Sequence, residues 1–85
     1  MERPIKELLQ IMVDNIELFE KKGCMGLCDL TNTLKYNQII SDAEESIIDK
    51  YVDTNAPKIP KSTYNWTPYE LQPRLEWLNE QIAKL

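Results

Sequence analysis

The residues best suited to bind a small molecule gather in the last third of the chain. Aromatic and basic side chains are concentrated there, namely Lys58, Lys61, Tyr64, Trp66, Tyr69, Arg74 and Trp77. An aromatic ring can stack on a nucleobase, and an ammonium or guanidinium group can pair with phosphate. This cluster therefore predicts a ligand-binding site for a nucleotide-derived molecule. The same composition is also typical of a segment that covers an exposed core, so the cluster is a pocket, a core lid, or both.

Two cysteines, Cys24 and Cys28, lie four residues apart. Two thiolates can supply half of a tetrahedral zinc site, but the chain has no His and no further Cys to complete one, unless a symmetric dimer shared the site. The cations closest in sequence that could activate a thiolate are Lys21 and Lys22. We expect both cysteines to be small buried core residues, and we predict no metal and no cofactor.

Carboxylates gather where a helix is predicted to begin. Asp42, Glu44 and Glu45 lie in or next to its first turn, where the helix dipole favours negative charge. They lack the glycine-centred loop of a calcium site, so we expect them to be solvated. Without His the chain cannot form a Ser/His or Cys/His pair or an imidazole proton shuttle. We therefore predict no catalytic residues and no enzymatic activity.

The first element expected to position these residues is a helix over residues 4–22. Pro4 suits its start and Gly23 its end. At about 100° per residue, its apolar side chains cover an arc of about 220°, interrupted by Asn15 and Glu20. The arc comprises Ile5, Leu8, Leu9, Ile11, Met12, Val13, Ile16, Leu18 and Phe19. An arc this wide predicts a helix that is central to the core or also lies in a subunit interface.

Two further helices are predicted in the middle of the chain. A turn at residues 23–28, in which Gly26 allows close backbone approach, leads into a helix. One side of that helix carries Leu27, Leu30, Thr31 and Leu34. Residues 36–40 break the helical period, and Ser41 and Glu44 have the spacing of a capping box. The next helix is predicted from Asp42 to about Thr54, ending at Asn55.

The C-terminal quarter is predicted to begin with an extended loop, because residues 56–66 contain two prolines and no helical period. A second capping box at residues 67–70 opens a short helical turn, and Pro73 starts or kinks the last helix. The predicted buried stripe of that helix consists of Leu75, Leu78, Ile82 and Leu85. Arg74, Trp77 and Gln81 flank this stripe, so we expect them to be half-buried at its boundary.

Composition limits the partners. The 85 residues carry 10 Lys and Arg against 14 Asp and Glu, and residues 23–55 hold six acidic and two basic side chains. Nucleic-acid binders concentrate basic residues on one face, so we predict no nucleic-acid partner. No apolar run is long enough to span a membrane, and the first residues lack the layout of a signal peptide. We expect a cytoplasmic protein without a membrane partner, whose cysteines stay reduced.

Scattered positions resemble small uncharacterised accessory proteins of tailed phages. The resemblance spans residues 24–82, and its positions are Gly26-Leu27-Cys28, Ile39-Ile40-Ser41 before Glu44, Tyr51 with Asn55 and Pro57, Tyr64, Trp66, Pro73-Arg74 and Trp77-Leu78. Those proteins usually carry a basic residue where this chain has Ala56. The resemblance implies a protein that binds a host factor, either a nucleotide signal of a bacterial defence system or a host protein.

Taken together, these observations predict an all-α fold in one helical domain, residues 1–85. We expect a small bundle of helices, with a Pro- and aromatic-rich loop and a short helical turn before the C-terminal helix. An 85-residue chain builds only a marginal core, so we expect a homodimer or higher homo-oligomer through the first helix. The predicted function is phage counter-defence by sequestering a nucleotide-derived immune signal. The alternative is an inhibitor that docks on a host protein through its acidic central region or its wide apolar helix.

Overall fold

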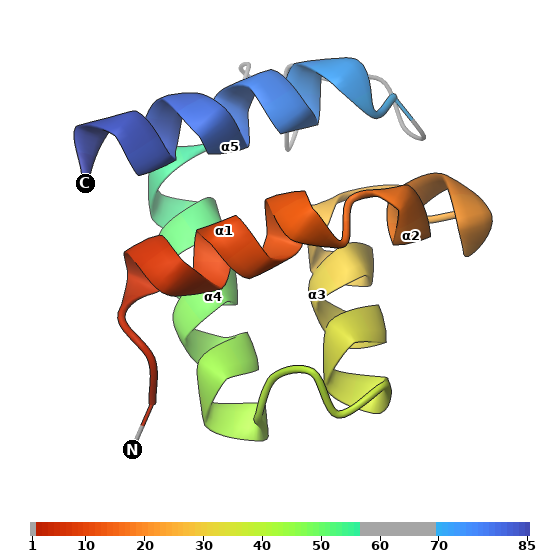
Figure 1. Ribbon diagram of the computed structural model, residues 1–85, viewed down its shortest axis with the longest axis horizontal. Coiled ribbons are helices and arrows are strands. Elements are labelled where there is room, and N and C mark those ends of the chain that lie inside the picture. Colours follow the sequence, from red (N-terminus) through yellow and green to blue (C-terminus); the bar gives the residue numbers. More distant parts are fainter. Residues whose placement is uncertain (1, 57–69) are drawn as a thin grey trace.

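The computed structural model describes residues 2–56 and 70–85, which form five helices and no strand. The helices are α1 (Ile5–Asp14), α2 (Glu17–Lys21), α3 (Leu27–Tyr36), α4 (Asp42–Asn55) and α5 (Gln72–Lys84). The antiparallel pair α3 and α4 is crossed by α1, and α5 packs along α1 in the opposite direction (Figure 1). The all-α prediction is therefore confirmed for these residues. The predicted loop and the helical turn after it fall on residues 57–69, outside the described part.

Helix α1 lies at the centre of the core because its wide apolar arc faces α3, α4 and α5. Leu8, Leu9 and Met12 are fully buried, and Ile11 and Val13 pack against the edges of the same cluster. Each fully buried side chain of this size contributes about 1.5–3 kcal/mol of transfer free energy. The central position predicted for this helix is confirmed. The rest of the arc, Ile5, Ile11, Val13, Ile16 and Leu18, is only partly buried within the chain. The homodimer through this helix stays a prediction.

The single helix predicted over residues 4–22 is wrong, because the chain divides into α1 and α2 at Asn15 and Ile16. Asn15 Nδ2 donates to the carbonyl of Ile11 at 2.8 Å, an oxygen that also accepts the backbone N–H of Asn15. The next backbone bonds have i→i+3 spacing, from Ile16 N to the Val13 carbonyl and from Leu18 N to the Asn15 carbonyl. Side-chain bonding of this kind competes with the regular helical pattern.

Gly23 ends α2, as predicted, in a left-handed conformation with φ of +66°. The N–H of Cys24 donates to the Phe19 carbonyl at 2.8 Å, and the N–H of Gly23 donates to the Glu20 carbonyl at 3.2 Å. These two bonds form a Schellman motif, which satisfies carbonyls that the helix end leaves without partners. The reversal directs Cys24 into the core, where it is 4% exposed.

Helix α3 ends with the same motif, but the left-handed position is held by Gln38, with φ of +60°. The N–H of Ile39 donates to the Leu34 carbonyl, and the N–H of Gln38 donates to the Lys35 carbonyl, both at 2.9 Å. Glycine adopts this conformation without a steric penalty, whereas a residue with a Cβ is strained in it. The two turns therefore differ in strain although their hydrogen bonds match.

Helix α4 begins at the predicted capping box. Ser41 Oγ accepts from the N–H of Glu44 at 3.1 Å, and Glu44 Oε1 accepts from the N–H of Ser41 at 3.0 Å. The predicted solvation of Glu44 is wrong, because the residue is only 4% exposed. Its carboxylate is covered by Arg3, whose Nη2 lies 2.8 Å from Oε1 and whose Nε and backbone N each lie 2.9 Å from Oε2.

These donors hold the pKa of Glu44 well below its usual range, through the hydrogen bonds from Arg3 first and from Ser41 next. Arg3 Nη2 also donates to the Ile39 carbonyl at 2.9 Å. The guanidinium thus bridges the N-terminal segment, the turn after α3 and the first turn of α4. We call this arrangement of Arg3, Ser41 and Glu44 the Glu44 clamp.

The buried face of α5 is rotated from the predicted one. Leu78 is fully buried, as expected, but Arg74, Trp77 and Gln81 are also buried, whereas Leu85 is 47% exposed. Leu75 and Ile82 are only partly buried. Gln81 accepts a hydrogen bond from Tyr51, and the Arg74 guanidinium contacts the Phe19 ring and the Glu70 carbonyl, so both residues find partners within the fold.

The two Schellman motifs respond oppositely to substitution. We expect Gly23→Ala to lower the free energy of unfolding by about 1 kcal/mol, because the new Cβ is strained at positive φ. Gln38→Gly should raise it by about 0.5–1 kcal/mol for the converse reason. Urea denaturation followed by circular dichroism measures both. Gln38→Ala is the matched control, and equal midpoints for Q38G and Q38A would contradict the strain at this position.

The Glu44 clamp should make stability fall in acid. The folded pKa of Glu44 lies below its ordinary value of 4.5, so its contribution is present above that pH and is lost as the pH falls toward the folded value. We expect the free energy of unfolding to drop more between pH 6 and pH 3 in the wild type than in Glu44→Gln. The exposed Glu80→Gln is the control and should keep the wild-type slope. Parallel pH profiles for wild type and E44Q would rule out this role.

Candidate functional site

The residues of the predicted ligand-binding cluster fall into two groups. Lys58, Lys61, Tyr64, Trp66 and Tyr69 lie outside the described residues. Arg74 and Trp77 lie on α5 and are 3% and 7% exposed, so they are core residues rather than the half-buried boundary residues expected. Their surroundings show what they contact.

Arg74 connects α5 with the segment around α2. Its guanidinium carbon lies 5.5 Å from the centre of the Phe19 ring, and its Nη1 donates to the Glu70 carbonyl. A Cβ built on Gly26 would lie 3.9 Å from Arg74 Nη2, so the guanidinium also reaches the turn before α3. That distance is an ordinary van der Waals contact, which means that the close backbone approach predicted at Gly26 does not require glycine. Arg74 thus stabilises the packing of three elements.

Trp77 connects α5 with α4 through Tyr51. The centres of the two rings lie 6.3 Å apart, with their planes inclined at 51°. Next to them, the Tyr51 hydroxyl donates to Gln81 Oε1 at 2.7 Å. This bond satisfies a buried side-chain amide and fixes the rotation of the Tyr51 ring. Tyr51 is only partly buried, and it also lines a hollow on the surface.

That hollow is a groove of about 290 Å³ between the start of α1 and the second half of α4. We call it the Tyr51 groove, and its lining residues are Ile5, Ile47, Lys50, Tyr51, Thr54 and Asn55. Two isoleucines and one ring supply its apolar surface, and Lys50 is the charged residue of this lining within the described part of the chain. The volume lies just below the range of pockets that hold drug-sized molecules, roughly 300–1,000 Å³.

The sequence carried a partial signal for this groove. Ile47, Tyr51 and Asn55 follow one another at intervals of four residues, which puts them on one face of α4. The missing information was the position of Ile5, which the Glu44 clamp brings alongside that face. The sequence prediction placed the binding site in the cluster of basic and aromatic residues later in the chain instead.

A second surface surrounds Cys28, where α3 and α4 both contribute carboxylates. Cys24 is buried as predicted, but the prediction for Cys28 is wrong, because this residue is exposed. Partial burial of the thiol and the negative charges of Asp49, Asp53 and Asp29 raise the pKa of Cys28 to about 11. The thiol therefore stays protonated at neutral pH and is a poor nucleophile and metal ligand.

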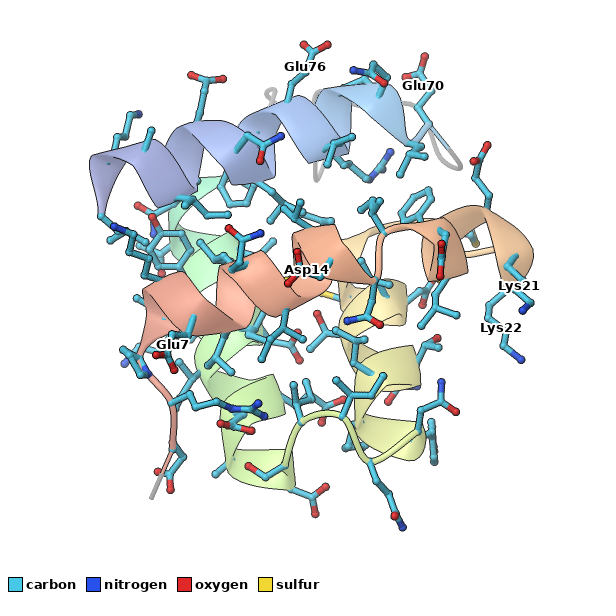
Figure 2. The ribbon with its side chains drawn as sticks, viewed as in Figure 1. Glu7, Asp14, Lys21, Lys22, Glu70 and Glu76 are labelled. Carbon is cyan, nitrogen blue, oxygen red and sulfur yellow. The ribbon has the colours of Figure 1, made fainter. Side chains whose placement is uncertain are left out.

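The lysines nearest to the cysteines in sequence do not change this chemistry. Lys21 and Lys22 project outward from the end of α2, away from the body of the molecule (Figure 2). Among residues 2–56 and 70–85, no three His, Cys, Asp or Glu side chains are grouped so that they could hold a metal ion. In the same residues, no helix has the length and apolar character needed to cross a bilayer.

Searches against protein-family models, curated proteins and solved structures find no match to this chain.

Proposed function

We propose that this chain is a non-enzymatic binding protein that sequesters a nucleotide-derived ligand in the Tyr51 groove. The observation that carries the proposal is the lining, which combines an aromatic ring, two isoleucines and one cation. A base can lie against the ring and the aliphatic side chains, and Lys50 can pair with a phosphate. The proposed site thus moves from Arg74 and Trp77 to the adjacent face of α4.

The ring of Tyr51 is well suited to this role because it is already held in place. Its hydroxyl is bonded to Gln81 and its ring lies beside Trp77, so little side-chain entropy is lost when a ligand binds. The protonated Cys28 thiol and the absence of His from the chain favour binding without turnover. Sequestration needs only an affinity that is high relative to the concentration of the ligand.

The resemblance to small tailed-phage accessory proteins supports a biological setting for this binding. In that setting the protein acts in the cytoplasm of the infected host, as a homodimer or higher homo-oligomer, and the ligand is an immune signal of a bacterial defence system. Each molecule withdraws ligand from the pool that activates the defence. The protein then works in proportion to its amount rather than by catalysis.

Isothermal titration calorimetry with a panel of cyclic nucleotides and ADP-ribose derivatives tests this function. We expect at least one compound to bind with micromolar or tighter affinity. Lys50→Met should weaken that binding by about tenfold, which corresponds to the loss of about 1.4 kcal/mol from one charge-assisted contact. Lys84→Met, at an exposed position of α5, is the control. The proposal is wrong if no compound in the panel releases heat at high micromolar concentration.

A second candidate is the inhibitor that docks on a host protein, and the acidic surface around Cys28 favours it. Asp29, Asp49 and Asp53 lie close enough together to act on one thiol, and such a surface steers a basic partner. Pull-down from a bacterial lysate should then retain a host protein that the double variant Asp49→Asn, Asp53→Asn loses. The pair Glu76→Gln, Glu80→Gln is the control, since Glu76 points outward from α5 (Figure 2). Equal retention by both double variants would exclude this surface.

A further inference from the structure

The wall that α1 contributes to the Tyr51 groove has few contacts of its own. Ile5 is partly buried, whereas the other side chains of residues 2–7 are exposed. Leu8 is the first residue of α1 that is fully buried. The N-cap position is held by Pro4, which provides no side-chain hydrogen bond to the first turn. The first turn of α1 is therefore secured neither by a cap nor by a row of core side chains.

The Glu44 clamp supplies an attachment for this turn. The backbone N–H and the Nε of Arg3 each donate to Glu44 Oε2 at 2.9 Å, and Arg3 Nη2 donates to Oε1 at 2.8 Å. The Pro4 carbonyl accepts the N–H of Leu8 at 3.1 Å, which begins the helical pattern of α1. The chain is thus attached at Arg3 by the clamp and at Leu8 by the core, and Ile5 lies between these two points.

The two attachments differ in their exposure to water. The Arg3 side chain is 42% exposed, so its guanidinium is readily hydrated when the ion pair breaks. Glu44 then still accepts from the N–H of Ser41. Leu8, in contrast, cannot leave the core without exposing its whole side chain. Segments with few buried contacts open locally while the rest of a fold stays intact, so residues 2–7 can open about Leu8.

Opening of this segment would remove one side of the groove. Within the described residues, Ile5 is the part of the lining that comes from α1, and the other lining residues all lie on α4. A single helix presents a convex surface, so these residues of α4 do not form a two-sided groove without Ile5. The groove described here therefore exists only while the first turn of α1 lies against α4.

We infer that residues 2–7 form a movable wall of the Tyr51 groove, which the Glu44 clamp holds in its binding position. This inference rests on the proposed function, because it takes the groove as a binding surface. A ligand that contacts Ile5 binds the clamped state and not the open one, so it stabilises the clamped state. Arg3 and Glu44 are then positioning residues for the site, since neither of them lines the groove.

Hydrogen exchange of backbone amides, followed by nuclear magnetic resonance at low urea concentrations, tests the wall in the full chain. We expect the Leu8 amide of the wild type to exchange faster than the Ile48 amide in the middle of α4, with a rate that hardly changes with urea. Exchange at Ile48 should rise with urea, because it requires global unfolding. Equal rates and equal urea dependence at both amides would overturn the inference.

Arg3→Gln tests the role of the clamp. We expect exchange of the Leu8 amide to become at least about tenfold faster, because the variant loses hydrogen bonds to a charged group. Lys6→Gln is the matched control, since it removes one exposed cation from the same turn of α1, and it should keep the wild-type rate. Equal rates at Leu8 in the wild type and R3Q would show that the clamp does not hold the wall.

A neutral apolar fluorescent probe, N-phenyl-1-naphthylamine, tests the link between the wall and the groove. At about ten times its dissociation constant, the probe should slow exchange at Leu8 about tenfold, because it binds only the clamped state. Ile47→Ala, in the wall from α4, should bind the probe more weakly and show less slowing at the same concentration. A wild type that does not bind the probe, or binds it without slowing exchange at Leu8, would overturn the inference. If the probe slows exchange but no nucleotide binds, the proposed function fails and the movable wall stands.

Discussion

The ion pair between Arg3 and the buried carboxylate of Glu44 joins three parts of the fold: the N-terminal segment, the turn after α3 and the first turn of α4. The carboxylate also accepts from the N–H of Ser41. A buried charge is tolerated only when its lone pairs are satisfied, so these parts must hold one arrangement together. Ile5 follows Arg3 by two residues and Ile47 follows Glu44 by about one helical turn. The Glu44 clamp therefore places the two isoleucines of the Tyr51 groove next to each other.

Features of the fold that depend on neighbouring residues in the sequence were predicted from short sequence patterns. The apolar face of α3 and the capping box of α4 need only a few consecutive residues, and both agree with the structure. The break at Asn15 was missed because a side chain that bonds its own helix looks, in sequence, like any polar residue on a helix face. The burial of Glu44 was missed for a different reason. Its partner Arg3 lies 41 residues away in sequence, and no local pattern connects the two.

The rotation of α5 shows the limit of counting apolar residues. Hydropathy ranks Arg74 and Gln81 as surface residues, but a long aliphatic stem and a satisfied polar end let such side chains enter a core. Phe19 and Tyr51 supply partners from elements far away in sequence, whose positions depend on the complete fold, whereas the Glu70 carbonyl is a local partner four residues before Arg74. The groove was not predicted for the same reason: one of its walls comes from α1 and the others from α4, so it forms only when the two helices pack together.

The pairing of α1 with α5 has a consequence for how the chain reaches this structure during synthesis. Helix α1 is synthesised before α5, so the part of its apolar arc that packs on α5 stays uncovered until α5 has been made. Helices α3 and α4 are joined by a short turn and can associate earlier through contacts of low sequence separation. The contact between α1 and α5 joins segments that are far apart in sequence, and apolar surface on α1 is exposed until that contact forms.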